Sequence, residues 1–508
     1  MRPAKNTWIL SIMLLLFSGS LFAQDKPIKP ATPNASPEAK ALLQLLYNLS
    51  GKYTLTGQHN FASAADRNSR FAADYSGKTP VIWSTDFGFA KAGDKDSHLR
   101  RADMVQEAIR QYQKGSIVAL CWHAVPPTAN EPVTFQPLPG ADTLMLASVQ
   151  GHLTDQQFKD ILTPGTALHK QWEAQVDTIA FYLKQLQKAH VPVLWRPYHE
   201  MNGNWFWWGN RVGKYSTAAL YRQIYDRLVN YHKINNLVWV WSVDRPSKPG
   251  MEFVNFYPGD KYLDILALDV YGSDFKQDYY DKLNALSQGK LLALAEVGSP
   301  PSPEILDAQP KWSYWMIWSG MVRNTSKKQY EALDNDPRVL GLDDSVYIKA
   351  LNPIRESLGQ SPLPVHKPAD FTGEWVLNED KSTLGTFGSG NLPHKIIITQ
   401  NGEQLSVQKS YIEEWQDNRV TNESITLNGK EITSGDAKSP RVSAAGLSAN
   451  ADTAIINAKA TMNYGGRSFQ MISKEKWNLN NHGKTLIITQ YSDSPFGKRS
   501  VIMVYDKQ

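Results

Sequence analysis

Short apolar runs alternate with longer amphipathic segments between residues 53 and 319. The runs cover residues 53–58, 81–85, 117–122, 191–195, 237–242, 265–271, 291–297 and 313–319. Most are nearly continuous in Val, Ile, Leu and Trp, which is typical of strands buried on both faces of a parallel sheet. Between them, apolar residues recur at helical spacing in segments 99–114, 169–189, 216–232 and 277–288.

Strands that alternate with helices in this way predict an α/β fold, a (β/α)8 TIM barrel over residues 38–357. The alternative is a doubly wound open sheet, which normally carries a glycine-rich phosphate loop after its first strand. Gly57-Gln58-His59-Asn60 at that position does not have this pattern. We therefore expect the barrel, with some long loops.

The pattern changes near residue 358. Residues 358–369 form a proline-rich linker, which we expect to be extended. Beyond it the helical period is lost, and turns such as Asn401-Gly402 separate short alternating segments at 395–400, 404–409, 424–427, 474–479, 485–489 and 499–505. We predict a smaller all-β domain over residues 370–508, either an antiparallel barrel or a sandwich.

The first 23 residues have the features of a signal peptide. Arg2 and Lys5 precede an apolar stretch at 8–17, and small residues lead to Ala23. This stretch is too short for a membrane anchor, which needs about 20 apolar residues. We expect cleavage after Ala23, a linker at 24–37, and a secreted or periplasmic protein with no membrane attachment after the signal is removed.

Composition narrows the possible functions. The chain has 508 residues, of which 42% are apolar and 20% charged, as in ordinary globular proteins. A net charge of +5 is too dilute for a nucleic-acid-binding surface, so we expect no nucleic-acid partner. A single cysteine excludes an internal disulfide, and we find no motif for a metal or nucleotide cofactor. We expect a monomer without a cofactor.

Two glutamates end apolar runs, where barrel enzymes carry their reacting groups. Glu200 follows the fourth run and Glu296 ends the seventh. A pair of carboxylates across a barrel mouth suits glycoside hydrolysis, in which one protonates the leaving oxygen and the other attacks or activates water. The acid needs a raised pKa, and the four aromatic residues at 205–208 make Glu200 the better candidate for it.

The sequence around Glu200 carries a family resemblance. Residues 195–203, Trp-Arg-Pro-Tyr-His-Glu-Met-Asn-Gly, and 205–209, Trp-Phe-Trp-Trp-Gly, resemble the acid/base segment of glycoside hydrolase family 26. The resemblance covers residues 40–355 and implies a retaining enzyme on a (β/α)8 barrel. By this resemblance Glu200 is the acid/base and Glu296 is the nucleophile, on the fourth and seventh strands.

The resemblance also implies the substrate and the residues that hold it. Most members of the family are β-1,4-mannanases, which predicts cleavage of mannan, glucomannan or galactomannan, as polysaccharide or oligosaccharide, through a glycosyl-enzyme. Arg196 is implied to support the site, and the residues implied to bind substrate are His123, His199, Trp205, Asp269, Tyr271 and Trp318. The long segment 124–165 departs from the family pattern, and we expect it to shape distant subsites.

Several alternatives stay open. Other members of the family are β-1,3-xylanases or mixed-linkage β-glucanases, and a barrel of this kind can also be a non-catalytic carbohydrate-binding protein. A zinc-protease motif is excluded because position 203, where a second histidine would stand, is glycine. We expect Trp239 and Trp241 to belong to the barrel core, whereas the places of Trp207 and Trp208 stay open.

The all-β domain offers weaker signals. Its opening segment at 371–375, Phe-Thr-Gly-Glu-Trp, resembles the first strand of lipocalin-like barrels. Trp375, Trp415 and Trp477 could bind a glycan or fill a small core, and we favour the core.

Overall fold

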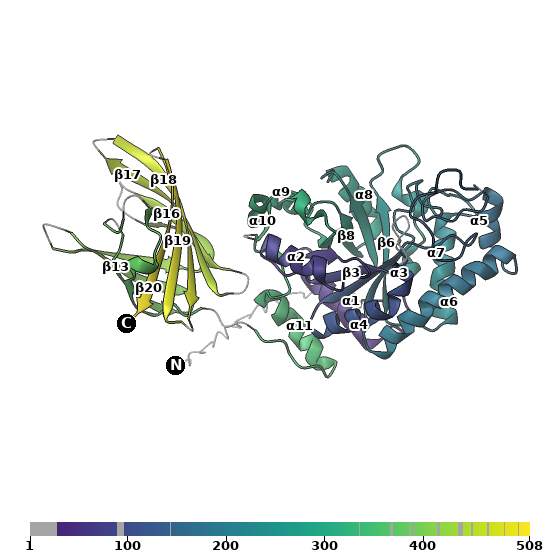
Figure 1. Cartoon of the computed structure of the whole chain (residues 1–508), viewed down its shortest axis with the longest axis horizontal. Helices are drawn as coiled ribbons and strands as arrows, with labels where there is room; N and C mark the ends of the chain where they lie inside the picture. The colour runs from purple at the N-terminus through teal and green to yellow at the C-terminus, as the bar shows by residue number, and fades with distance from the viewer. Residues whose placement is uncertain are drawn as a thin grey trace, which may run out of the picture.

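The computed structural model describes residues 28–508 except 89–95, 143, 335, 366–368, 386–387, 391, 414–416, 435–439, 449–450, 465–466, 482 and 496. The predicted signal peptide, part of both predicted linkers and Trp415 lie outside the described residues. The described chain forms one unit of helices and strands followed by one unit of strands (Figure 1).

A closed parallel barrel forms the first unit. Its strands are β2 (Gly57–His59), β3 (Ile82–Asp86), β4 (Ile117–Trp122), β5 (Val193–Pro197), β6 (Leu237–Asp244), β7 (Ile265–Val270), β8 (Leu291–Val297) and β9 (Trp312–Ile317). Neighbours in sequence pair in parallel, and β9 also pairs with β2, so the sheet closes on itself. The predicted TIM barrel is confirmed. Short strands β1 (Thr54–Leu55) and β10 (Val339–Leu340) pair beside it.

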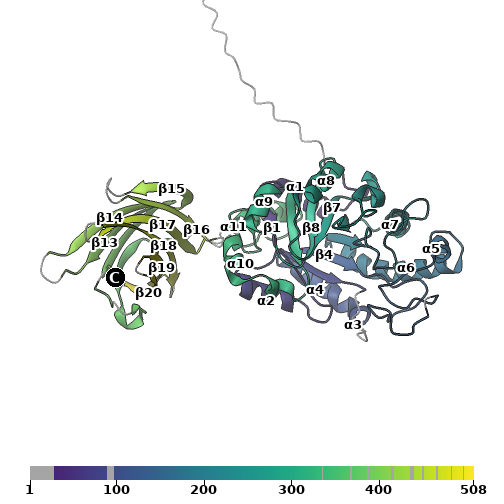
Figure 2. The same cartoon turned by 90° about the horizontal axis from the view of Figure 1, so that it is seen from above.

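Helices surround the barrel strands (Figure 2). They are α1 (Pro37–Leu49), α2 (Arg67–Ser76), α3 (Asp96–Leu99), α4 (Arg101–Gln113), α5 (Asp155–Ile161), α6 (Ala167–Lys188), α7 (Thr217–Tyr225), α8 (Gln277–Ser287), α9 (Pro303–Ala308), α10 (Lys327–Asp334) and α11 (Ser345–Ser357). Short 3-10 or π segments are η1 (Asp226–Tyr231), η2 (Phe253–Phe256), η3 (Asp260–Tyr262), η4 (Met321–Asn324) and η5 (Glu379–Lys381). The search of the described residues for a helix that could span a membrane finds none.

Each barrel strand is buried on two faces, as its continuous apolar run predicts. Trp195 and Trp239 belong to the core that includes helix residues such as Val176 of α6. Their neighbours Leu194 and Val238 belong to a second core, shared with residues of α1. Because successive side chains of a strand point to opposite faces, these two cores lie outside and inside the strand ring. The prediction that Trp239 and Trp241 are core residues is confirmed, since both are fully buried.

The second unit is a ten-stranded antiparallel sheet in its described residues. Its strands are β11 (Gly373–Leu377), β12 (Lys395–Asn401), β13 (Gln404–Tyr411), β14 (Arg419–Thr426), β15 (Asn428–Ser434), β16 (Arg441–Leu447), β17 (Thr453–Tyr464), β18 (Arg467–Asn480), β19 (Thr485–Ser494) and β20 (Gly497–Lys507). The sheet is nearly closed, with β14 and β15 at its edges, so the barrel alternative is correct. Trp375 and Trp477 are fully buried, and the prediction that they form core is confirmed for these two.

Some predicted boundaries differ from the structure. The apolar run at 53–58 is divided into β1 and β2 instead of forming one strand. The segment at 124–165 is not a plain loop, because it contains the capped helix α5. The predicted segments do not include β15, β16 and β17. These strands are largely polar, so they lack the strong apolar face that predicts a strand. Residues 31 and 36, within the predicted linker at 24–37, hydrogen-bond to the barrel through Asp264 and Asn235.

A buried ion pair joins the segment before α11 to the barrel. Lys78 Nζ lies 3.0 Å from Asp344 Oδ2 and donates to the carbonyl of Val339 at 3.0 Å. The exposed fractions of the two charged side chains are 8% and 5%. Neither charge has access to bulk water, so each depends on the other.

We predict that Asp344→Ala lowers the free energy of unfolding of the barrel by about 3–5 kcal/mol, because it leaves the Lys78 charge buried and unpaired. Urea denaturation followed by tryptophan fluorescence measures the change. Asp343→Ala, at the neighbouring and more exposed position, is the control and should change stability little. Equal stability of the two variants would contradict this account of the pair.

Candidate active site

The predicted site residues lie at the carboxyl-terminal ends of the barrel strands, where TIM-barrel enzymes carry their active sites. The structure brings them together in three contacting groups. One contains Arg196, Asp269, Tyr271 and Glu296, the second Glu200 and Trp205, and the third His123, His199 and Trp318.

The loop after β5 holds Glu200 in an uncommon backbone conformation. Tyr198 and Glu200 have φ values of 49° and 50°, a left-handed region that few non-glycine residues adopt. Two indole groups stabilise this loop: Trp172 Nε1 donates to the Tyr198 hydroxyl at 2.9 Å, and Trp208 Nε1 donates to the carbonyl of His199 at 2.8 Å. These hydrogen bonds hold the backbone on which Glu200 stands.

Glu200 is buried beside Trp205 and close to other carboxylates. Its side chain is buried, and Trp205 Nε1 donates to its Oε2 at 2.6 Å. Burial raises the pKa of Glu200 well above the ordinary glutamate value, and the charges of Glu296 and Asp269 act in the same direction. The Trp205 hydrogen bond opposes them. Glu200 thus holds a proton at pH values where an exposed glutamate has lost it.

Gly203 has a steric role in placing Trp205. A Cβ atom at position 203 would lie 2.2 Å from Cη2 of the Trp205 ring, closer than real Cβ atoms approach. Any other residue would displace the ring from its place beside Glu200. The glycine of the predicted motif is therefore a condition for the Trp205–Glu200 hydrogen bond.

A β-bulge turns Glu296 toward the barrel interior. Ala267 of β7 pairs with Ala293 of β8, but Asp269 pairs with Glu296, so β8 has one extra residue in this interval. Leu294 packs on the core that the helices cover. Strict alternation would turn Glu296 to that same outer side, and the extra residue reverses its direction.

Two donors hold the Glu296 carboxylate. Arg196 Nη2 donates to Oε2 at 2.6 Å, and the Tyr271 hydroxyl donates to Oε1. Burial and the charge of Glu296 raise the pKa of Tyr271, so the phenol keeps its proton and remains a donor. Each oxygen of the Glu296 carboxylate therefore accepts a hydrogen bond, and each has a different donor.

Arg196 links Glu296 to Asp269. Its Nη1 donates to Asp269 Oδ2 at 2.8 Å and to Ser242 Oγ at 3.3 Å. Burial raises the pKa of Asp269, Arg196 opposes this, and the charge of Glu296 adds to it. Asp269 is fully buried, and its Oδ1 has no hydrogen-bond partner within the described residues, so this carboxyl group acts on the site through Arg196.

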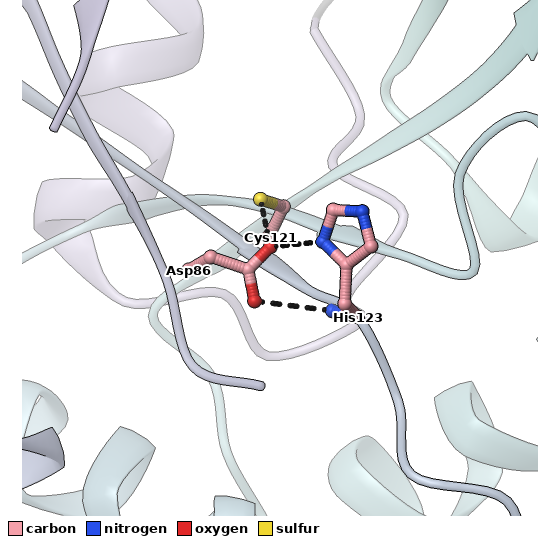
Figure 3. Close-up of side chains that lie close together, drawn as sticks. All are labelled: Asp86, Cys121 and His123. Atoms are coloured by element: carbon pink, nitrogen blue, oxygen red, sulfur yellow. Dashed lines mark hydrogen bonds and ion pairs between the residues drawn. The ribbon is translucent and has the colours of Figure 1, made fainter. Parts of the chain in front are cut away.

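His123 belongs to a hydrogen-bonded cluster with Asp86 and Cys121 (Figure 3). Asp86 Oδ2 lies 2.5 Å from His123 Nδ1 and 2.7 Å from Cys121 Sγ. The spacing of these three groups would fit a metal ion. However, a thiol binds metals as thiolate, and burial followed by the Asp86 charge raises the pKa of Cys121. The cluster is better suited to holding protons than a cation.

His199 lies in an aromatic cluster behind His123. Its ring centroid is 4.3 Å from that of His123 and 4.9 Å from that of Phe206, and its two nitrogens have no partner among the described residues. Burial lowers the pKa of His199 well below the ordinary value, so the ring is neutral. Trp207 and Trp208, whose places the sequence left open, are both fully buried and form core rather than cleft.

Trp205, Tyr271 and Trp318 are the partly exposed aromatic residues of the predicted site. The Trp318 ring stacks on His59, with centroids 3.9 Å apart and an interplanar angle of 21°. Flat apolar ring faces at a cleft are suited to stacking on sugar rings.

Asp86 and His59 were missed by the sequence prediction. Asp86 is the last residue of β3 and directly follows the apolar run at 81–85. The rule that selected Glu200 and Glu296, a carboxylate that ends a run, would have found it. His59 ends β2 in the same way, but no acidic or motif signal marks it.

The long segment 124–165, after β4, packs beside the loop that carries Glu200. The backbone N–H of Gly151 donates to the carbonyl of Trp205 at 2.9 Å, and Gln150 forms a β-bridge with Phe206. The segment therefore contacts the loop of the acid/base candidate directly, and its effect on distant subsites stays a prediction.

Comparisons with known proteins show the family to which the barrel belongs. A model of glycosyl hydrolase family 26 matches residues 31–344, which contain every predicted site residue. The solved structure of GH26A from Muricauda sp. is 41% identical and covers 61% of this chain and 98% of its own, with a TM-score of 0.56.

Curated relatives carry the name mannan endo-1,4-beta-mannosidase. The one from Thermothelomyces thermophilus is 34% identical over 316 residues, 61% of this chain and 59% of that protein. The one from Bacillus subtilis strain 168 is 29% identical over 393 residues, 69% of this chain and 99% of that protein. This chain thus spans about three-fifths of the length of the fungal relative.

We predict that Trp205→Phe moves the alkaline limb of the pH–activity profile to higher pH. The indole N–H stabilises ionised Glu200. Loss of this hydrogen bond therefore raises the pKa of Glu200 further, and the protonated form persists to higher pH. The dependence of kcat/KM on pH for glycoside hydrolysis measures this, because it reports groups of the free enzyme. An unchanged limb, or one moved to lower pH, would contradict the assignment.

Proposed function

The chain belongs to glycosyl hydrolase family 26, and we propose that its barrel hydrolyses β-1,4-mannosidic bonds of mannan, glucomannan or galactomannan with retention of configuration. The observation that carries the proposal is the pair of buried glutamates in different environments, Glu200 favouring its proton and Glu296 held by two donors. The mannan substrate is supported by the names of the relatives described above.

The first step uses both glutamates at once. A Glu296 oxygen attacks the anomeric carbon, and the bond from that carbon to the leaving oxygen breaks as Glu200 transfers its proton to that oxygen. The products are a glycosyl ester of Glu296 and a departed sugar hydroxyl. Arg196 and Tyr271 keep the attacking carboxylate aligned before the reaction.

The second step reverses the role of Glu200. Ester formation removes the negative charge of Glu296, which is the main charge that raises the pKa of Glu200. Glu200, now ionised, therefore becomes more stable as a carboxylate and can take a proton from water as the water attacks the anomeric carbon. The bond to Glu296 breaks, and both glutamates return to their starting states.

In this proposal the partly exposed aromatic residues contact the sugar, and the rings of Trp205 and Trp318 offer flat faces for stacking. The buried residues support them: Asp269 holds Arg196, and His199 packs against His123, which lies next to Trp318. These contacts would orient the ring at the bond that is cleaved.

We expect Glu296→Ala to reduce kcat on soluble galactomannan by at least about a thousandfold while substrate binding persists, because the nucleophile is lost but the subsites stay. Glu200→Ala should lose activity on mannan but keep the first step on an aryl mannoside with a good leaving group, which needs no acid. Reducing-sugar release and release of the aryl group measure the two reactions. Glu304→Ala, on the exposed face of α9, is the control.

Persistent turnover by Glu296→Ala would exclude this residue as the nucleophile. No release from mannan, with release from β-1,3-xylan or mixed-linkage glucan, would keep the chemistry and change the substrate. No release from any of the three by folded protein would favour a non-catalytic carbohydrate-binding protein.

We expect the β-anomer as the first product of mannan-oligosaccharide hydrolysis, because two displacements at one carbon restore its configuration. Proton NMR of the anomeric signals in the first minutes of the reaction measures this. Initial appearance of the α-anomer would mean direct attack by water and would contradict the glycosyl-enzyme.

Export is part of the proposal. The charged start and the apolar stretch at 8–17 support cleavage after Ala23 and release to the periplasm or the medium as a monomer. Mass spectrometry of the protein from a native-like host would give the mature N-terminus, and light scattering would give its oligomeric state.

A further inference from the structure

Asp86 is a buried carboxylate for which the proposed reaction has no direct use. It is the last residue of β3. Its side chain points at Cys121 of β4 and at His123, which directly follows β4 (Figure 3). It has no place among the sequence-predicted site residues. Its hydrogen bonds nevertheless reach a histidine of the sugar-binding part of the site.

Among the described residues, four donors converge on this carboxylate. Oδ2 accepts from His123 Nδ1 at 2.5 Å and from Cys121 Sγ at 2.7 Å. Oδ1 accepts from the backbone N–H of His123 at 3.1 Å and from that of Gly88 at 2.7 Å. Burial alone would raise the pKa of Asp86, but His123 and Cys121 hold it below its ordinary range. Asp86 is therefore an ionised acceptor.

Gly88 lies close to the backbone of His123, and its N–H helps to fix which carboxylate oxygen of Asp86 faces the backbone. A Cβ atom at Gly88 would lie 2.3 Å from the carbonyl oxygen of His123, so the two backbone segments meet here without room for a side chain. The carboxylate is thus held at one end by main-chain donors and presents its other oxygen to the imidazole.

The His123 ring is confined by its neighbours. Its centroid lies 4.3 Å from that of His199, 5.3 Å from that of Phe206 and 5.8 Å from that of Trp318. Rotation of the ring would break both the packing and the Asp86 hydrogen bond. Trp318 is a sugar-stacking candidate, so the imidazole borders the sugar subsite.

We propose that Asp86 is a positioning residue that keeps a proton on Nδ1 of His123, and thereby decides whether Nε2 of the ring donates or accepts a hydrogen bond. When the ring is neutral, a proton on Nδ1 leaves the lone pair on Nε2, which suits a sugar hydroxyl as the donor. The identity of the sugar rests on the proposed function, whereas the position of the proton on His123 does not.

Cys121 assists Asp86 in this arrangement. Its thiol stays protonated because burial and the Asp86 charge raise its pKa, so it donates to the same oxygen as His123. Two donors on Oδ2 leave this oxygen little freedom to turn from the ring. The lone cysteine of the chain thus acts as a hydrogen-bond donor and not as a nucleophile.

The variant Asp86→Asn tests the proposal because the backbone decides how the amide is oriented. The N–H groups of Gly88 and His123 require an acceptor, so the amide oxygen takes the place of Oδ1 and the NH2 group faces Nδ1. Nδ1 must then accept, and when the ring is neutral its proton lies on Nε2. The variant is isosteric with the native side chain, so the ring keeps its place.

Nitrogen-15 NMR of the full chain labelled at histidine, recorded at a pH high enough for a neutral ring, distinguishes the two tautomers, and His123→Gln identifies the signals. We expect the Nδ1–H form in the native chain, the Nε2–H form in Asp86→Asn, and a decrease in kcat/KM on mannan of about tenfold or more. Asp278→Asn, on the exposed face of α8, is the matched control and should change neither quantity.

An Nε2–H tautomer in the native chain would overturn the proposal, as would inversion in Asp86→Asn without loss of kcat/KM. Cys121→Ala gives a second test if Asp86→Asn does not fold, because it should keep the Nδ1–H form with a smaller loss of activity. Inversion in Cys121→Ala would also overturn the proposal. The NMR result needs no substrate, so it separates failure of this inference from failure of the mannan assignment.

Discussion

The site depends on one buried guanidinium that is held between two carboxylates. Arg196 reaches Asp269 on β7 and Glu296 on β8 from its own place on β5, and all three are buried. An unpaired charge at this depth would be strongly destabilising. The parallel register of these strands meets this constraint by bringing Arg196, Asp269 and Glu296 together at one end of the barrel.

Two glutamates of the same chemical type acquire different properties at this barrel mouth. Glu200 lies on a loop that aromatic residues hold, where burial and nearby negative charge raise its pKa. Glu296 faces the guanidinium of Arg196, which stays charged, and the phenol of Tyr271, which keeps its proton. The difference arises from the neighbours, and it suits the acid and nucleophile roles that we propose.

Much of the fold could be predicted from periodicity, because continuous apolar runs of this length have few stable places other than a buried parallel sheet. The weaker predictions failed where that signal faded. Polar strands β15, β16 and β17 have few apolar positions, and the capped helix α5 is only seven residues long. Trp207 and Trp208 could not be assigned because they lie in a loop, where strand alternation gives no direction.

The sequence by itself determined the order of the barrel strands, the two domains and the presence of Glu200 and Glu296 at or just after barrel strands, because these follow from local patterns along the chain. Only the tertiary structure decided where the side chains point. The extra residue in β8 turns Glu296 inward against the simple alternation of its strand. Asp86 likewise reaches His123 only because β3 and β4 pair in parallel. Such contacts depend on register between distant segments, which no local pattern contains.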